Sequence, residues 1–177
     1  MKVTTKYKSV FLPSGQDFPN CSGVIRALKR DETKPIATRS SDGPGDASDI
    51  FNHRESKTSG TKETIGSWWC IDLGKNHLLG ISHYALRHGR SDGKSILQHW
   101  KLEGSNDGIS WTKLDHESKS KFPQFRDPYP FVTGTWSVED KVGVFRFFRI
   151  LQTGMNSSNE YGIYLSGVEL YGILLHV

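Results

Sequence analysis

The residue types that most often carry catalysis or hold metal ions are scattered along this 177-residue chain and form no known motif. The four histidines between positions 77 and 99 do not have the spacing of an HExxH zinc site, and Cys21 and Cys70 cannot form a zinc-finger pattern. The stretch 104–108, GSNDG, lacks the G-x-S-x-G of a nucleophile elbow and the Lys-Ser/Thr of a phosphate loop. We therefore expect a protein that is not an enzyme and that needs no cofactor.

Carboxylates gather in one short stretch, where Asp42-Gly43-Pro44-Gly45-Asp46 is followed by Asp49. Oxygen ligands of this kind suit Ca²⁺, although the twelve-residue EF-hand pattern is absent. A calcium site involving Asp42, Asp46 and Asp49 and a solvated acidic loop both remain open at this point.

The segment 88–95, HGRSDGKS, is a stronger candidate for binding. It connects two apolar stretches, and its Arg90, Asp92 and Lys94 are more polar groups than a tight turn needs. Arginine recognises carboxylate and amide groups with a planar fork, and aspartate accepts hydrogen bonds from basic or hydroxyl groups. The segment is either a site for a polar ligand or a solvated surface loop.

The elements that would position this segment are β-strands. From Ser67 onward, alternating apolar and polar residues and turn signals predict strands in 67–74, 78–88, 145–154 and 164–175. In the second of these, strict alternation puts Leu79, Ile81, His83, Ala85 and Arg87 on one face. The stretch 24–29, VIRALK, is the one candidate for a short helix and could equally be a strand, and 33–66 and 119–136 show no strand character. Loops of that length are often functional.

A β-hairpin is predicted at 99–114, HWKLEGSNDGISWTKL. Asn106-Asp107-Gly108 supplies residues that tolerate positive φ, and Trp100 is expected to face Trp111 across the turn. Many short strands with almost no helix predict an all-β fold of antiparallel sheets packed face to face, as a sandwich or jelly roll.

Length and composition indicate the number of domains, the compartment and the kinds of partner to expect. The length suits one domain, 1–177. The chain has no apolar run of about 20 residues and no secretory h-region, so we expect no membrane insertion. Two cysteines permit at most one disulfide, which favours a reducing, cytoplasmic compartment. The net charge of +4 is mild and the densest basic stretch, 26–34, is interrupted by acids, so nucleic acid is not an expected partner.

Four segments together resemble the discoidin or coagulation-factor C-type domain, a galactose-binding-like jelly roll. They are 69–74 (WCIDLG), 100–111 with EGSNDGISW, 145–150 (FRFFRI) and 168–172 (VELYG), and the resemblance is best over 67–173. Secreted members of this family commonly join the first and last strands by a disulfide, whereas Cys21 and Cys70 do not bracket this domain. The chain instead resembles the intracellular branch, in which such domains accompany BTB or ubiquitin-ligase modules. This implies a domain excised from a larger protein.

The resemblance assigns scaffold and site residues. Asp72, Arg146 and Arg149 are expected to pair and orient the sheets, and Trp68, Trp69, Trp100 and Trp111 are expected to pack in the core or at a sheet edge. Three loops should meet at one end of the sandwich: 49–54 (DIFNHR), 88–95 (HGRSDGKS) and 155–161 (MNSSNEY). The ligand-binding residues expected there are Phe51, Asn52, His53, Arg54, His88, Arg90, Asp92, Lys94, Asn159 and Tyr161.

The function that these observations favour is recognition of a protein or peptide partner, as in substrate recognition by a ubiquitin-ligase or BTB-type protein. Phe51 and Tyr161 would add aromatic area that can anchor an interface. The alternative is a carbohydrate-binding module, whose shallow site would combine an aromatic ring with polar groups such as Arg90, Asn159 and His53. The sequence does not distinguish a monomer from a dimer.

Overall fold

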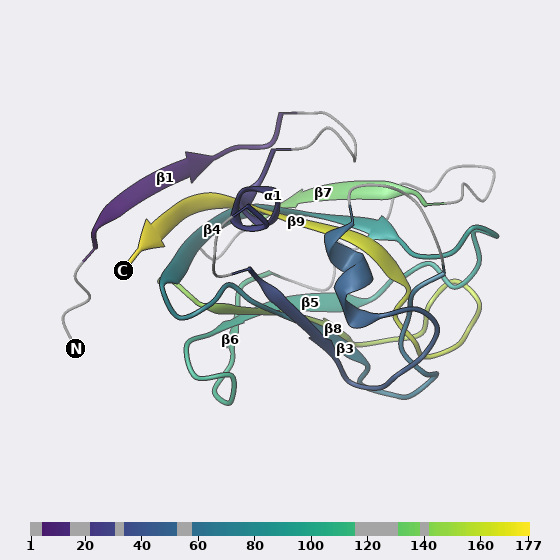
Figure 1. Cartoon of the computed structure of the whole chain (residues 1–177). Helices are drawn as coiled ribbons and strands as arrows, with labels where there is room; N and C mark the ends of the chain where they lie inside the picture. The colour runs from purple at the N-terminus through teal and green to yellow at the C-terminus, as the bar shows by residue number, and fades with distance from the viewer. Residues whose placement is uncertain (1–4, 15–21, 31–33, 53–57, 116–130, 139–141) are drawn as a thin grey trace.

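The structure, a computed structural model, describes residues 5–14, 22–30, 34–52, 58–115, 131–138 and 142–177. It consists of two antiparallel sheets stacked as a sandwich (Figure 1). One sheet has the strand order β1-β9-β4-β7 and the other β2-β3-β8-β5-β6. The strands are β1 (Tyr7–Phe11), β2 (Ile36–Arg39), β3 (Trp68–Asp72), β4 (His77–His88), β5 (Trp100–Ser105), β6 (Thr112–Lys113), β7 (Thr133–Ser137), β8 (Phe147–Gln152) and β9 (Leu165–His176), with a helix α1 (Val24–Leu28) and a 3₁₀ helix η1 (Ala47–Phe51). The predicted all-β antiparallel sandwich is confirmed.

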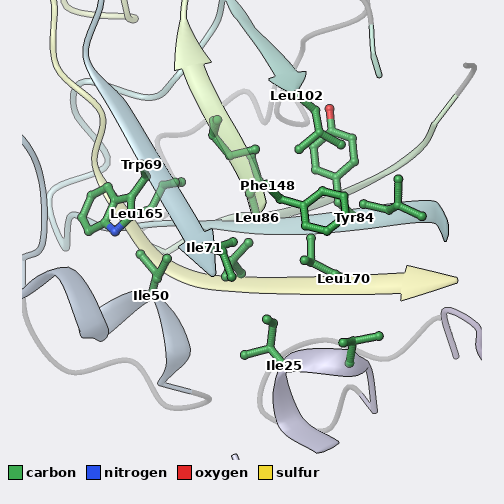
Figure 2. Close-up of a cluster of buried hydrophobic side chains, with 14 of the residues drawn as sticks. Ile25, Ile50, Trp69, Ile71, Tyr84, Leu86, Leu102, Phe148, Leu165 and Leu170 are labelled. Carbon is green, nitrogen blue, oxygen red and sulfur yellow. The ribbon is translucent and has the colours of Figure 1, made fainter. Parts of the chain in front are cut away.

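The core lies between the two sheets (Figure 2). Trp69 of β3 and Phe148 of β8 have no exposed surface, and they share one apolar cluster with Leu86 of β4 and Leu170 of β9. Inward-facing residues alternate along β3 and β8, as a half-buried sheet requires. Trp69 and Trp100 therefore have the core role expected of them, at 0% and 2% exposure.

β4 departs from strict alternation. Ile81 pairs with Gly172 of β9, but His83 pairs with Tyr171, so β4 contains one extra residue at this point. This bulge exchanges the two faces of the strand beyond it. Strict alternation put His83 and Ala85 on the same face as Leu79 and Ile81. Leu79 and Ile81 point into the core, but beyond the bulge Tyr84 and Leu86 do so in place of His83 and Ala85.

Three strands were not predicted. β2 lies inside the stretch 33–66 and β7 inside or just beyond 119–136, both of which were expected to have no strand character. The third, β1, has mostly exposed residues and pairs with β9 at the edge of its sheet. Short strands of four or five residues are recruited by the neighbour that pairs with them, so their own pattern is weak. The ambiguous stretch at 24–29 forms helix α1.

The hairpin at 99–114 exists, but its register differs from the predicted one. Glu103 pairs with Lys113 and Gly104 with Thr112, while Trp100 pairs with Gln152 of β8 and not with Trp111. Asp107 holds the long turn, because its Oδ1 accepts hydrogen bonds from the backbone N–H groups of Ile109 (2.8 Å) and Ser110 (2.7 Å). Trp111 is half-buried, with the Arg149 guanidinium 4.1 Å from its ring centroid.

The charged residues expected to orient the sheets do pair. Both Arg146 side-chain contacts to Asp72 are 2.6 Å long, and Arg149 donates to Glu103 Oε2 through Nε (2.8 Å) and Nη2 (2.5 Å). Both pairs join residues of different strands or strand ends that are far apart in sequence. The predicted pairing of Asp72, Arg146 and Arg149 is confirmed, and both pairs lie within the five-stranded sheet.

A buried carboxylate of β9 holds helix α1 on the sheet. Glu169 is fully buried, and its Oε1 accepts hydrogen bonds from the backbone N–H of Ile25 (2.7 Å) and of Leu170 (3.0 Å), while Oε2 accepts from Arg26 N–H (3.2 Å). The first N–H groups of a helix have no partner within it, so this carboxylate replaces a local N-cap. Gly23 must be glycine here, because a Cβ would lie 2.3 Å from Glu169 Cδ.

Candidate functional site

The segment 88–95 is shaped by its own arginine and aspartate. Arg90 Nε donates to Asp92 Oδ1 (2.9 Å) and Arg90 Nη2 to Asp92 Oδ2 (2.7 Å), a fork-to-fork contact. Asp92 Oδ1 also accepts the backbone N–H of Lys94 at 3.0 Å. The Arg90 hydrogen bond is the main reason that the pKa of Asp92 falls to about 2, and in turn it raises the pKa of Arg90. The pair therefore stays charged and keeps the segment in one conformation at neutral pH.

Arg90 is also fixed from two further directions. Its Nη1 donates to Ser95 Oγ at 3.3 Å, and its guanidinium lies 4.9 Å from the centroid of the Tyr164 ring. The side chain retains 24% exposure and that of Asp92 42%, so both can still meet a ligand. Tyr164 was not among the predicted site residues. Its place directly before β9 carried no signal that its ring would lie under Arg90.

The second and third predicted loops meet. Ser95 N–H donates to Ser158 Oγ (2.9 Å), Ile96 N–H donates to Ser157 Oγ (2.8 Å), and Ser157 N–H donates to the Ile96 carbonyl (2.9 Å). Asn156 shapes the third loop, since its Oδ1 accepts from Ser158 N–H at 3.0 Å and its side chain is 1% exposed. The two serines and Asn156 were missed as named site residues, although asparagine and serine are the usual formers of such local turns.

The first predicted loop joins this end through Arg87. The Arg87 guanidinium is 2% exposed and donates through Nη2 to the Asn52 carbonyl (2.9 Å) and the Ser166 carbonyl (2.8 Å), and through Nε to Ser166 Oγ (3.0 Å). It therefore ties the end of η1 to β4 and β9, directly before the segment 88–95. Asn52 contributes its backbone, and its side-chain amide donates to Asp49 at 3.3 Å.

Two predicted residues are buried. Phe51 is 6% exposed and belongs to the core, so its ring offers no surface for stacking on a ligand. The 3₁₀ turn of η1 places it there beside Ile50, against β9. His88 has no exposed surface, so it lies beneath the loops and not on them. His53 and Arg54 lie outside the described residues.

His88 is held neutral by its surroundings. Burial lowers the pKa of its imidazole from 6.5 to about 4, and the backbone of Lys94 and Tyr164 offsets part of that effect. Neither ring nitrogen meets hydrogen-bond geometry with a described residue. Protonation would place a charge on a buried His88 side chain that solvent does not reach. The buried start of the segment 88–95 therefore favours the neutral imidazole.

Backbone conformations that are unfavourable for residues other than glycine gather at this end. Within the described part of the chain, the three such residues with positive φ are Ser95 (58°), Phe131 (55°) and Asn159 (59°). Ser95 and Asn159 belong to the second and third loops, and Phe131 N–H approaches the Arg90 carbonyl at 3.4 Å. Left-handed conformations at such residues cost free energy and concentrate at functional sites.

The exposed groups of the two loops are polar. Lys94 and Asn159 are exposed and Tyr161 is half-buried. Together with Arg90 and Asp92 they present donors and acceptors of both charges on a rigid base. Such a surface can bind a polar ligand by hydrogen bonds and ion pairs.

The acidic stretch at 42–49 is organised by an arginine. Arg39 donates through Nη1 to the carbonyls of Pro44 (3.0 Å) and Gly60 (2.8 Å), and through Nη2 to those of Gly43 (3.2 Å) and Gly45 (2.7 Å). Asp46 and Asp49 form the capping box of η1, and the Asp42 side chain is 94% exposed. Among the residues that the structure describes, no three His, Cys, Asp or Glu side chains are grouped to hold a metal ion. The Arg39 guanidinium thus binds the carbonyl oxygens of this loop.

The comparison with known sequences agrees with the resemblance seen in the chain. No protein-family model matches it. Over 123 residues it is 37% identical to the E3 ubiquitin-protein ligase Ufd4 of Drosophila melanogaster, and over 116 residues it is 33% identical to the BTB/POZ domain-containing protein At2g30600 of Arabidopsis thaliana. These matches cover 66% and 61% of this chain but 4% and 13% of those proteins. The chain therefore corresponds to a small part of each relative.

Solved structures identify the fold. CpGH89CBM32-5 from Clostridium perfringens, solved in complex with GalNAc-β-1,3-galactose, superposes with a TM-score of 0.63 at 15% identity, covering 85% of this chain and 100% of that one. A fucolectin from the serum of Morone saxatilis, the striped bass, superposes with a TM-score of 0.57 at 16% identity, covering 88% of this chain and 48% of that one.

The chain has the discoidin-like, galactose-binding-like β-sandwich fold that the sequence predicted. Its sequence relatives are of the two kinds expected, a ubiquitin ligase and a BTB protein. At 15% and 16% identity, these two neighbours show the fold of this chain. No helix in the described part of the chain is long and apolar enough to cross a membrane.

Proposed function

We propose that this chain is a non-catalytic recognition module that binds a protein or peptide partner through the loops 88–95 and 155–161. The observation that carries the proposal is the concentration of left-handed non-glycine residues at this end. Ser95 and Asn159 each lie in one of the two loops, and Phe131 approaches Arg90. Left-handed conformations at residues such as Ser95 and Phe131 cost roughly 1–3 kcal/mol each, and less at an asparagine. They are retained where the surrounding structure and a function require them.

The charged groups of the loops support a polar partner. Arg90 and Asp92 are already paired, so a ligand does not have to order two flexible side chains when it binds. Their exposed edges, with Lys94 and Asn159, offer hydrogen bonds of both polarities to a peptide backbone and to charged side chains. The names of the sequence relatives favour a protein partner, because ubiquitin ligases and BTB proteins act on or assemble with other proteins.

The chain offers a matched control for testing this site. The Arg90→Ala, Asp92→Ala double variant removes the paired fork of the loops. The Arg146→Ala, Asp72→Ala double variant removes a pair of the same chemistry from the ends of β3 and β8 in the five-stranded sheet. Both variants and the wild type would be used for affinity capture from cytosolic lysate. Captured proteins would then be purified and their affinity measured by calorimetry.

We expect a partner that wild type and the Arg146, Asp72 variant retain and that the Arg90, Asp92 variant loses at least tenfold in affinity. Circular dichroism and thermal melting of each variant would confirm that it is folded. If all three proteins captured the same partners with equal affinity, the loops would not be the binding surface.

Carbohydrate binding is the second candidate, and the observation in its favour is the lectin character of the solved neighbours. Against it, the Tyr164 ring lies under Arg90 and is 7% exposed, so that aromatic face is not open to a sugar. A glycan array that includes GalNAc-β-1,3-galactose and fucosylated glycans would test this candidate. Saturable binding that is lost in the Arg90, Asp92 variant would favour a glycan over a peptide.

The setting of the domain follows from the same proposal. We propose that residues 1–177 form one discoidin-like domain within a longer cytoplasmic protein, and that the partner reaches the other modules of that protein through it. Localisation of the tagged full-length protein by microscopy would test the compartment.

A further inference from the structure

A separate apolar surface lies at the other end of β4 and β9, away from the loops. Val10, Leu12 and Ile173 are exposed by 61%, 63% and 45%. With Gly80 of β4 and Gly172 of β9 they line a hollow of about 390 Å³. Helix α1 covers the outer face of the same sheet farther along β9, through Glu169, and leaves this part uncovered.

The strand at this surface is the outermost one of its sheet. β1 pairs with β9 along one side, and in the described part of the chain no strand pairs with its other side. Figure 1 shows it at the edge, next to the end of β9. An exposed edge of this kind presents unpaired backbone groups that can accept another strand.

The outward face of β1 carries charged residues in its first half and apolar residues in its second. Alternate residues of a strand share a face, and Val10 pairs with the outward-facing Ile173. The same face therefore carries Lys6, Lys8, Val10 and Leu12 in order, all of them exposed. Ser9 and Phe11 are less exposed, and Phe11 packs against the core. The first half of this face is positive and the second half is apolar.

The charges near β1 distinguish between a second copy of the chain and an acidic partner at its open edge. The chain segments at this surface, 5–14, 77–83, 142–145 and 170–177, contain no Asp or Glu. A second copy of the chain pairing through β1 would bring four lysines, two from each copy, onto one sheet face without a carboxylate from these segments. A partner with carboxylates opposite Lys6 and Lys8 avoids this repulsion.

We propose that β1 binds an extended acidic-apolar peptide segment, which adds to the sheet as a strand. Its backbone pairs with the open edge of β1, the mode of recognition known as strand addition. Two of its carboxylates, at alternate positions, face Lys6 and Lys8. Its next two alternate side chains are apolar and pack on Val10 and Leu12, at the rim of the hollow. This surface is independent of the loop site.

Amide chemical shifts of the ¹⁵N-labelled protein would test the proposal. The probes are two synthetic octapeptides, Glu-Thr-Glu-Thr-Val-Thr-Val-Thr and the reversed order, which allow parallel and antiparallel pairing. A third and fourth probe have lysine in place of glutamate. We expect an acidic probe to shift the amides of 6–12 and 172–174, with at least tenfold weaker binding for its lysine counterpart.

Variants separate the two halves of the face. Lys6→Glu, Lys8→Glu should lose binding of the acidic probe, and Val10→Thr, Leu12→Thr should weaken it several-fold. Ile109→Thr is the matched control, because Ile109 is 83% exposed in the hairpin turn and should not affect binding. The proposal is overturned if neither acidic probe shifts these amides, if shifts cluster elsewhere, or if the lysine probes bind equally well. Shifts of β1 that depend on protein concentration without any peptide would show instead that a second copy occupies the edge.

Discussion

Two arginine–aspartate pairs in this chain have nearly the same geometry but stabilise different parts of it. In each, Nε and Nη2 of the arginine contact the two oxygens of one carboxylate, and the same Oδ1 also accepts a backbone N–H two residues further on. Arg146 and Asp72 are 74 residues apart and join the sheet ends of β3 and β8. Arg90 and Asp92 are two residues apart and fix one loop.

The difference shows how one interaction serves two purposes. A contact between residues distant in sequence holds two strands of the five-stranded sheet together, so its loss affects the fold. A contact within one loop restricts the shape of that loop and leaves the rest unchanged. The loop pair is also the more exposed at its carboxylate, 42% for Asp92 against 17% for Asp72. Preorganising a loop in this way favours binding, not stability.

The largest effect is expected at Arg87, which directly precedes the loop 88–95 and ties η1 to β9. Arg87→Ala removes three hydrogen bonds to Ser166 and Asn52 and leaves a buried space, so the free energy of unfolding should fall by about 3 to 5 kcal/mol. Urea unfolding would measure it. Arg90→Ala, three residues further on, is the control and should change the free energy of unfolding by less than about 0.5 kcal/mol. Equal losses in the two variants would mean that the loop pair carries as much of the fold as the buried arginine.

His88 should make the free energy of unfolding depend on pH. Its pKa is about 4 in the folded protein and 6.5 in the unfolded chain, so the unfolded chain takes up a proton first as the pH falls. The contribution of neutral His88 is complete above pH 6.5, is lost between 6.5 and 4, and does not change further below that. At about 1.4 kcal/mol for each pH unit, the loss is about 3 kcal/mol. Urea unfolding at several pH values should show it in the wild type and not in His88→Leu; the same slope in both proteins would exclude His88 as its source.

Removing each arginine–aspartate pair compares the two regions directly. Arg146→Ala, Asp72→Ala should lower the free energy of unfolding by about 1 to 2 kcal/mol, since the pair is partly screened by solvent. Arg90→Ala, Asp92→Ala should change it by less than about 0.5 kcal/mol. Thermal melting and urea unfolding of both double variants would measure this. A larger loss in the loop variant would reverse the division between scaffold and site.

The smallest expected effect is on the titration of Asp92. Its carboxyl has a pKa of about 2 in the wild type, mainly because of the hydrogen bond from Arg90. Arg90→Ala should return this pKa toward 3.8, the ordinary value. NMR titration of the Asp92 side chain would measure both values. Because Asp92 is exposed, little stability should change with it, and an unchanged pKa would mean that the pair does not persist in solution.

Particular strands and residues show how much of the fold could be predicted from the sequence. β3 and β8 were predictable because each lies inside its sheet, so that buried and part-exposed residues alternate along it. That Asp72, Arg146 and Arg149 form structural pairs was also predicted, from the resemblance, but their partners were not: Arg146 contacts Asp72 and Arg149 contacts Glu103. β1, β2 and β7 were missed because all three are edge strands with few buried residues, so their sequences show little alternation.

The candidate site divides in the same way. Arg90, Asp92 and Lys94 stood out because a tight turn does not need them, and the meeting of loops 88–95 and 155–161 was expected from the resemblance. The burial of Phe51 and His88 was not predictable, because burial depends on neighbours that are distant in sequence. Tyr164 was missed for the same reason, since it joins the site through a contact with a residue 74 positions away.

The sequence by itself determined the β-sandwich, the pairing role of Asp72, Arg146 and Arg149, and the polar character of the segment 88–95. These follow from local alternation and from residue chemistry, which are properties of short stretches of chain. Tertiary structure alone decided the bulge in β4, the placement of Arg87 between η1 and β9, and the occupation of the 42–45 carbonyls by Arg39. Each of these depends on where distant backbone groups come to lie, because a buried donor or acceptor has to find its partner wherever the packed sheets place one.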